Sequence, residues 1–282
     1  MPPRRHLLVP SLLLLLPCTS FCTATTIVAV RYGTGPQSGV VVGADTRTSS
    51  GGYVSNRFAA KLTFVLDRET DVFTSVDDGS NDEHADDDGD NSSDKDSVVQ
   101  STPPPPPTAD ASTCCVCRSG SAADTQALAD AVRTDLLNRH LSQGRRGTVT
   151  SATRLLQNMI RNDADGSLSA SLICAGYDHV RGESCMYSVS PGGTAMEEPR
   201  YAVQGSGSGY IYGYLEAGII GDGATGKEGG RRLEEWNEEE AIEFVARVVG
   251  LAVERDGSSG GFCRIFSINR AGKKEYAKVL HR

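Results

Sequence analysis

The stretch Thr25-Thr26-Ile27-Val28-Ala29-Val30 decides how the rest of the chain is interpreted. Its β-branched and apolar residues alternate between two faces, which predicts a β-strand with Thr25 at its tip. The preceding apolar segment has the features of a removable leader and ends at Ala24. Cleavage after Ala24 would leave Thr25 with a hydroxyl group and a free amine on the same residue.

An N-terminal threonine can act as a nucleophile that carries its own base. A hydroxyl is a weak nucleophile at its own pKa and needs an adjacent general base. An α-amine, with a pKa of about 7.7–8.0, is partly neutral at cellular pH and can accept the proton. Threonine with its own amine is one of the convergent variants of the serine triad. The alternative is that two threonines simply open a strand, as β-branched residues often do.

The leader itself allows two interpretations. Arg4 and Arg5 precede an apolar run from Leu7 to Leu16, and small residues follow up to Ala24. This is the pattern of a secretory signal, and the run is too short to span a bilayer. A propeptide that masks Thr25 until assembly would also end at or near Ala24.

The acidic charge of the chain is concentrated in one place. The 282 residues carry a net charge of −8, but Asp77 to Asp96 contain ten acidic residues and one lysine, so the remainder carries +1. A nearly neutral remainder has no basic footprint for nucleic acid and no polybasic membrane patch.

Composition divides the chain into a leader (1–24) and one domain (25–282) with two insertions. Residues 70–113 are acidic and rich in Ser, Asp and Asn, and end in a proline run, so they are predicted to be a disordered insertion before structure resumes at Cys115. The second insertion, 218–235, is glycine-rich.

The predicted elements fall into groups rather than alternating. Grouped strands and grouped helices favour an α+β layered domain over βαβ units. The expected elements are strands between 25 and 68, helices at 119–141 and 152–160, strands at 171–177 and 185–189, a helix after Gly205-Ser206-Gly207, a last helix capped by Asn237 with Glu240, and strands at 262–269 and 274–279.

No cofactor or metal site is expected. Cys114 and Cys117 form a single C-x-x-C without a second pair, which favours buried thiols on a strand over a zinc site. The segment 221–228 fits a phosphate-binding loop except that Glu228 stands where Ser or Thr should hold magnesium.

Asp45 and Lys61 are charged residues beside apolar strands. A charge that is buried needs a partner. An ammonium group near the Thr25 amine would lower the pKa of that amine, and a carboxylate would orient the ammonium. The alternative is an ordinary ion pair on the surface.

Several segments, in the same order along the chain, resemble active proteasome β subunits, and within that family the caspase-like (post-acidic) type of the eukaryotic 20S core. The resemblance covers most of 25–68, 115–217 and 236–270. The segments are Thr25–Val30, Gly43–Arg47, Asn56–Leu62, Cys117–Gln126, Gly205–Gly207 with Tyr210–Gly213, and Glu254–Gly261.

The resemblance implies an N-terminal-nucleophile hydrolase fold, a four-layer αββα sandwich. Thr25 would attack the scissile carbonyl, its amine would shuttle the proton, and Asp45 and Lys61 would tune that amine. The positions that match the family's supporting polar cluster are Ser206, Asp256 and Ser259.

The resemblance also implies how substrate is held. The Gly120 amide matches the donor to the oxyanion. Arg118 falls at the base of the specificity pocket, where a guanidinium would pair with an acidic P1 side chain. The other pocket-lining matches are Thr48, Ser49 and Ala122.

The partners that the resemblance implies are the other α and β subunits of the 20S core in seven-membered rings, unfolded polypeptide substrates, and regulatory particles that dock on the assembled core. Nucleic acid and, in the mature form, membranes are not expected partners. The implied localisation is the cytoplasm and the nucleus.

Two features depart from the family pattern and keep alternatives open. The family has glycine before the nucleophile, and the methyl group of Ala24 predicts slower self-cleavage, which would suit a structural ring subunit that keeps its leader. The apolar leader and the sequon Asn91-Ser92-Ser93 would suit a secreted or organelle-targeted hydrolase of the same fold.

Overall fold

The computed structural model describes residues 25–50, 53–68, 111–163, 165–220 and 233–280. The predicted leader, most of the 70–113 insertion, and residues 221–232 of the 218–235 insertion lie outside these ranges. The phosphate-loop pattern at 221–228 and the sequon also lie outside them.

The helices and strands follow one another as groups along the chain. The first half contains β1 (Thr26–Tyr32), the 3-10 turn η1 (Gly35–Gln37), β2 (Gly39–Asp45), β3 (Thr48–Ser50), β4 (Tyr53–Asn56), β5 (Leu62–Leu66), β6 (Thr113–Gly120), α1 (Ala122–Gln143) and α2 (Val149–Arg161). The second half contains β7 (Ala170–Asp178), β8 (Glu183–Val189), β9 (Ala195–Glu197), β10 (Tyr201–Gly205), α3 (Ser208–Ile220), η2 (Leu233–Glu235), α4 (Glu238–Arg255), β11 (Phe262–Asn269) and β12 (Gly272–Val279).

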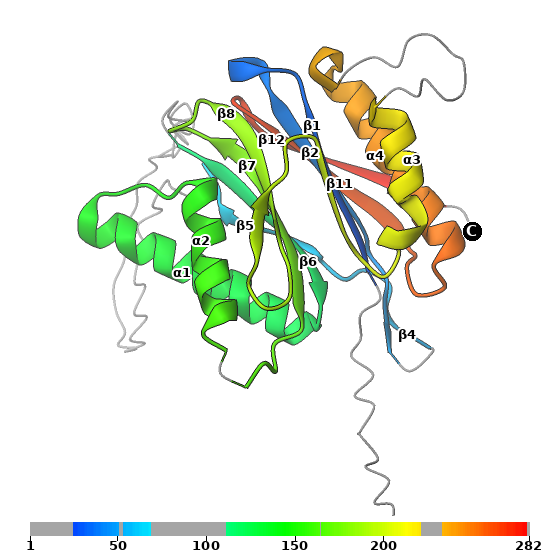
Figure 1. Cartoon of the computed structure of the whole chain (residues 1–282), viewed down its shortest axis with the longest axis horizontal. Coiled ribbons are helices and arrows are strands. Elements are labelled where there is room, and N and C mark those ends of the chain that lie inside the picture. The colour runs from blue at the N-terminus through cyan, green and yellow to red at the C-terminus, as the bar shows by residue number, and fades with distance from the viewer. Residues whose placement is uncertain (1–24, 51–52, 69–110, 164, 221–232, 281–282) are drawn as a thin grey trace, which may run out of the picture.

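Two antiparallel sheets lie face to face between two helix layers (Figure 1). The first sheet has the order β10-β1-β2-β11-β12, and the second has the order β5-β6-β7-β8-β9. Helices α3 and α4 cover the outer face of the first sheet, and α1 and α2 cover the outer face of the second. This is the four-layer αββα sandwich that the resemblance implies, and it confirms the α+β prediction.

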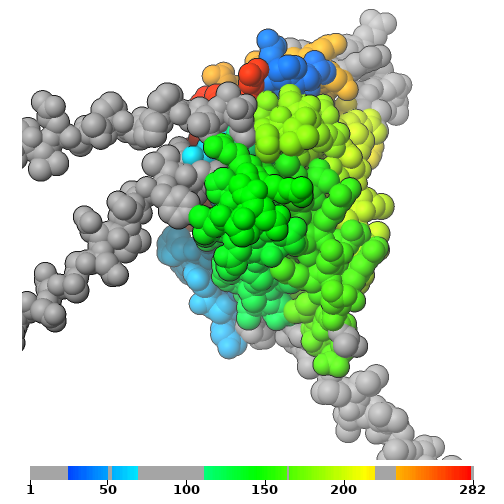
Figure 2. Space-filling model, turned by 90° about the vertical axis from the view of Figure 1, so that its left-hand side faces the viewer, coloured from blue at the N-terminus to red at the C-terminus, as the bar shows by residue number. Residues whose placement is uncertain are grey.

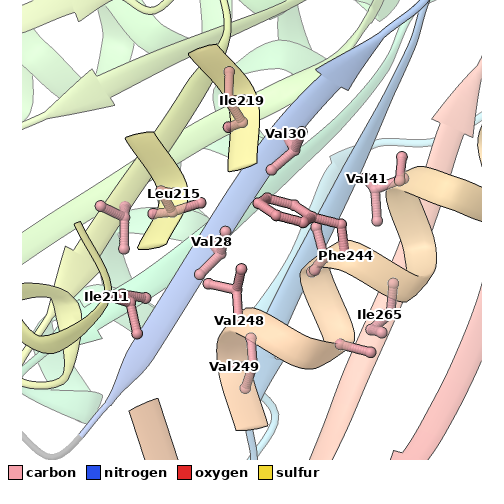
Figure 3. Packing of buried hydrophobic residues seen from close by; sticks show 14 of the residues in the cluster. Val28, Val30, Val41, Ile211, Leu215, Ile219, Phe244, Val248, Val249 and Ile265 are labelled. Atoms are coloured by element: carbon pink, nitrogen blue, oxygen red, sulfur yellow. The ribbon is translucent and has the colours of Figure 1, made fainter. Parts of the chain in front are cut away.

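The alternation of β1 separates two of the cores. Val28 and Val30 point to α3 and α4, where Leu215 and Phe244 pack on them (Figure 3). Ile27 and Ala29 point the other way, into the core between the two sheets. A strand that is buried on both faces has apolar residues at consecutive positions, which explains its unbroken apolar run.

The third core lies under α1 and α2, whose outer surfaces make up much of the face in Figure 2. Leu128, Val132 and Leu136 line one side of α1, as the helical spacing predicts. Leu156 and Ile160 of α2 complete the contact with the second sheet.

Helix ends follow the cap residues. The predicted capping box of α4 is present, with the Asn237 side chain accepting from the Glu240 backbone N at 2.9 Å and the Glu240 side chain accepting from the Asn237 backbone N at 3.0 Å. In α1 the cap is Ser121, so the predicted start at Ser119 is wrong. Ser119 and Gly120 belong to β6 and pair with β7, a long-range contact that helical spacing cannot reveal.

The boundaries of the first insertion also need correction. Residues 111–113 are buried, and Thr113 begins β6, so structure resumes before the predicted Cys115. Arg68 joins the two flanks: its Nε donates to the Ala111 carbonyl at 2.5 Å, and its guanidinium also binds the Arg270 carbonyl. The second insertion is shorter than predicted at its start, since α3 continues to Ile220.

In the parts of the chain that the structure describes, no helix is long and apolar enough to cross a membrane.

Candidate active site

Strand pairing brings Asp45 beside the start of β1. Ile27 pairs with Ala44 across the β1–β2 ladder, so Asp45 at the end of β2 reaches the first residues of β1. The Thr26 backbone N donates to Asp45 Oδ1 at 2.9 Å. Thr25 itself is 4% exposed and shares a small pocket with residues of the second sheet.

Asp45 and Lys61 form a buried ion pair rather than a surface pair. Lys61 Nζ donates to Asp45 Oδ1 at 2.8 Å and to the Arg47 carbonyl at 2.6 Å. The other carboxylate oxygen accepts from the Gly260 backbone N at 2.9 Å. The carboxylate is fully buried, so these donors replace the water it has lost. Lys61 lines the same pocket as Thr25.

Ser206, Asp256 and Ser259 form a second cluster on the other side of Thr25. The hydroxyls of Ser206 and Ser259 both donate to Asp256 Oδ2, each at 2.7 Å. The Thr25 backbone N donates to Ser206 Oγ at 3.2 Å. Three residues that the resemblance places in one supporting cluster are thus in contact, and Ser206 links them to the Thr25 nitrogen.

Asp256 is held in its charged form. Burial opposes ionisation, but hydrogen bonds from the Ser259 and Ser206 hydroxyls and the Ser258 backbone N outweigh it and lower the pKa of Asp256. At neutral pH the two serine hydroxyls therefore face a carboxylate. A hydroxyl that donates to this carboxylate presents its lone pairs to its other neighbour, which for Ser206 is the Thr25 nitrogen.

The glycines around Ser206 allow this close approach. A Cβ on Gly205 would lie 2.1 Å from the Thr25 carbonyl oxygen, and a Cβ on Gly207 would lie 2.1 Å from Thr26 Oγ1. Any side chain at either position would push the first residues of β1 away. Gly205 and Gly207 therefore leave the space that Thr25 and Thr26 occupy.

The pocket beside Thr25 is about 50 Å³ in volume and lies at the end of β6. Four of the predicted substrate-side residues line it: Thr48, Arg118, Gly120 and Ala122. Ser49 is not among the lining residues, and its hydroxyl donates to the Ser258 carbonyl at 3.2 Å. Asp45, Ser206, Asp256 and Ser259 are not among its lining residues either.

Arg118 is the charged group of this pocket. It is 8% exposed, and its guanidinium binds the Ala60 carbonyl and contacts Thr125 Oγ1 at 3.5 Å. Burial lowers the pKa of Arg118 while the charge of Asp130 raises it, and an arginine remains charged at neutral pH in either case. Among the described residues no acceptor reaches its buried Nε.

Four residues contribute to the site without having been predicted. Arg47 supplies the carbonyl that accepts from Lys61, and its guanidinium binds the carbonyls of Gly257 and Ser258. Ala60 and Thr125 contact Arg118, and Thr26 contacts Asp45 and Ser259. Arg47, Ala60 and Thr26 lie within two residues of Asp45, Lys61 and Thr25 in the sequence, and Thr125 lies seven residues after Arg118. This proximity is the signal that could have indicated them.

The cysteines near the site are buried thiols, as predicted. Cys114, Cys115 and Cys117 are buried on β6. Burial raises the pKa of Cys174 and Cys263 to about 12, so these thiols stay protonated and unreactive. Within the described ranges no group of three or more His, Cys, Asp or Glu side chains is arranged to hold a metal ion.

A larger cavity of about 300 Å³ lies between α1 and β5, away from Thr25. Its lining includes Leu136, Leu137 and Arg133, and Arg133 binds the Phe64 carbonyl. None of the predicted site residues lines it.

Comparison with known proteins agrees with the resemblance. The proteasome subunit family model matches residues 111–268. The chain is 34% identical to the probable proteasome subunit beta type-1 of Schizosaccharomyces pombe, over 88% of this chain and 81% of that protein. It is 32% identical to proteasome subunit beta type-6 of Arabidopsis thaliana (88% and 78% covered) and 31% identical to proteasome subunit beta type-1 of Saccharomyces cerevisiae (88% and 85% covered). The family match, the relatives and the four-layer fold lead to one conclusion: the chain belongs to the proteasome β-subunit family.

Proposed function

We propose that this chain is a threonine-type endopeptidase subunit that cleaves peptide bonds after acidic residues within the β ring of a 20S core. The observation that carries the proposal is the pocket that Thr25 shares with Arg118, whose buried Nε has no acceptor among the described residues. A buried donor without a partner costs free energy that a bound carboxylate would recover. An acidic P1 side chain supplies that carboxylate.

Cleavage before Thr25 turns its amide into an amine, and the reaction then proceeds in two steps. Thr25 Oγ attacks the scissile carbonyl carbon while the Thr25 amine takes the hydroxyl proton. The Gly120 amide stabilises the oxyanion, and collapse of the tetrahedral intermediate passes the proton to the leaving amine. Water then attacks the Thr25 ester and releases a peptide with an acidic C-terminal residue.

The two polar clusters have separate tasks in this scheme. The Lys61 ammonium, held by Asp45 and the Arg47 carbonyl, favours the neutral form of the Thr25 amine by like-charge repulsion. Ser206, oriented by Asp256, accepts a hydrogen bond from the Thr25 nitrogen and fixes its position. The amine is thereby kept neutral, as a base must be, and its orientation beside the Thr25 hydroxyl is fixed.

The partners are the other α and β subunits of the core in seven-membered rings, with unfolded polypeptides as substrates and regulatory particles docking on the assembled core. The domain extends from 25 to 282 after removal of 1–24, and the site of action is the cytoplasm and the nucleus.

The first test is the N-terminus and intact mass of the chain taken from the native assembly. A start at Thr25, together with cleavage of a fluorogenic peptide with glutamate at P1, supports the proposal. Replacing Thr25 by alanine should then abolish that cleavage. A processed chain that cleaves no P1-glutamate peptide would contradict the proposal.

A second candidate function rests on Ala24, which stands where the family has glycine. A chain that keeps residues 1–24 in the assembled particle would be a structural ring subunit without peptidase activity. The same mass measurement distinguishes the two functions.

A further inference from the structure

Thr26 is the second threonine of the opening motif, and the proposed reaction gives it no part. It is fully buried, and the alternation of β1 turns its side chain away from the pocket that holds Thr25. On that side lie α3, α4 and the loop that follows α4. Gly207 leaves the space that Thr26 Oγ1 occupies, because a Cβ at that position would lie 2.1 Å from the oxygen.

The hydrogen bonds of Thr26 join the two polar clusters. Its backbone N donates to Asp45 Oδ1 at 2.9 Å, and its Oγ1 lies 2.9 Å from Ser259 Oγ. Ser259 in turn donates to Asp256, which accepts from Ser206, and Ser206 accepts from the nitrogen of Thr25. A chain of hydrogen bonds therefore starts at Thr26 and returns to the residue before it.

The number of available protons decides which group donates in the hydrogen bond between Thr26 and Ser259. A serine hydroxyl has one proton, and that of Ser259 is donated to Asp256 Oδ2 at 2.7 Å. Ser259 can therefore only accept from Thr26, so the Thr26 hydroxyl is the donor. A hydroxyl that accepts a hydrogen bond becomes a better donor, since hydrogen bonds in a chain polarise one another.

We propose that Thr26 is a positioning residue, whose hydroxyl donates to Ser259 and so supports the Asp256–Ser206 pair that holds the Thr25 nitrogen. This role rests on the proposed peptidase function. Thr26 contacts neither the pocket nor the reacting atoms, so its loss acts on turnover and on the pH dependence of turnover, and not on substrate affinity.

The test uses the assembled core particle with four forms of this chain: wild type, Thr26→Val, Thr26→Ser and the control Thr153→Val. Valine replaces the hydroxyl by a methyl group of similar size, and serine keeps the hydroxyl. Thr153 is a buried threonine of α2 whose hydroxyl bonds the Val149 carbonyl in the opposite helix layer. It therefore measures the general effect of removing a buried hydroxyl.

Thr26→Val should lower kcat for a P1-glutamate peptide by about 10-fold, the loss expected for one buried hydrogen bond, with KM unchanged. The acid limb of its kcat profile reports the Thr25 amine and should move to higher pH. An Asp256 carboxylate with less support draws the Ser206 proton more strongly, and Ser206 then becomes a better acceptor for the charged form of that amine. Thr26→Ser should stay within about threefold of wild type. Thr153→Val should match wild type in kcat and in pH profile.

When the wild-type particle is active, two outcomes overturn the proposal: a Thr26→Val particle with wild-type kcat and acid limb, or a Thr26→Ser particle as impaired as the valine form. If the valine form does not assemble, Thr26→Ala removes the hydroxyl without the added branch and is judged by the same criteria. A wild-type particle that neither cleaves the peptide nor is labelled at Thr25 by a peptide electrophile overturns the peptidase function, and this role with it. An active wild type with an unaffected valine form overturns the role of Thr26 alone.

Discussion

The two sheets contribute to the candidate active site in opposite ways. The first sheet and its adjoining loops surround Thr25 with polar groups that already have partners, as in the bonds from Ser206 and Ser259 to Asp256. The second sheet brings Arg118, whose buried Nε has none among the described residues. Catalytic groups benefit from hydrogen bonds that are already formed before the substrate binds. A recognition pocket benefits from a hydrogen-bond donor that is left for the substrate to satisfy.

Lys61 gives the strongest test of the completed network. Lys61→Met leaves the Asp45 carboxylate buried without its counter-ion, and the free energy of unfolding should fall by about 3–5 kcal/mol. Peptidase activity should fall by a factor on the order of 10²–10⁴, because the proton shuttle loses its tuning charge. Urea unfolding of the full chain and peptide cleavage by the particle measure the two effects.

Lys274→Met is the matched control for Lys61→Met. Lys274 pairs with Glu238 at 3.3 Å, and its side chain is 61% exposed, so removing this pair should leave the free energy of unfolding nearly unchanged. Equal losses in the free energy of unfolding for the two lysine variants would mean that the buried Asp45–Lys61 pair stabilises the fold no more than an exposed pair does.

Arg118 tests the recognition side of the comparison. Arg118→Gln should lower kcat/KM for a P1-glutamate peptide by about 10- to 100-fold, the range expected for hydrogen bonds to a charged group. A P1-leucine peptide should be cleaved about as well as by wild type. Arg133→Gln on α1 serves as the control, because its guanidinium binds the Phe64 carbonyl and Arg133 does not line the Thr25 pocket. A loss of equal size for both peptides would show that Arg118 supports the fold rather than P1 choice.

Asp256 gives the smallest expected effect, which depends on pH. Its pKa is lowered in the folded chain, so the ionised form stabilises the fold above the unfolded-state pKa, and this contribution is lost as the pH falls through the lower folded-state pKa. The gap in unfolding free energy between wild type and Asp256→Asn should therefore be constant near neutrality and narrow below about pH 4. Urea titrations between pH 3 and pH 7 measure it, and a gap that widens towards acid would reverse the assigned sign.

The sequence predicted those parts of the fold that depend on local patterns. The apolar run after Thr25 is β1, and Asn237 with Glu240 does cap α4. The start of α1 was misplaced because Ser119 and Gly120 are held by pairing with β7, far along the chain. Strands β9 and β10 were not predicted, since short segments gain their strand character from neighbours that local periodicity does not reveal.

The candidate site depended on two different kinds of inference. Thr25, Asp45 and Lys61 were selected by their chemistry, and the structure brings Asp45 and Lys61 together in one buried pair. Ser206, Asp256 and Ser259 came from the resemblance alone, because no local pattern joins residues so far apart along the chain. Arg47 and Thr26 were not predicted, since their contacts with 257–260 exist only once α4 has packed on the first sheet. The roles proposed for Thr25, Lys61 and Arg118 in the reaction, and for Thr26 in positioning, stay predictions until the variants are measured.

The guanidinium of Arg68 has a practical consequence for anyone who modifies this protein. It bonds the Ala111 carbonyl, so the two ends of the intervening segment are tied together within the folded domain itself. The free energy of closing a loop rises by only about 0.6 kcal/mol for each doubling of its length. An affinity tag or a fluorophore placed between these two tied ends should therefore leave the pairing of β5 with β6, and with it the positions of Lys61 and Arg118, unchanged.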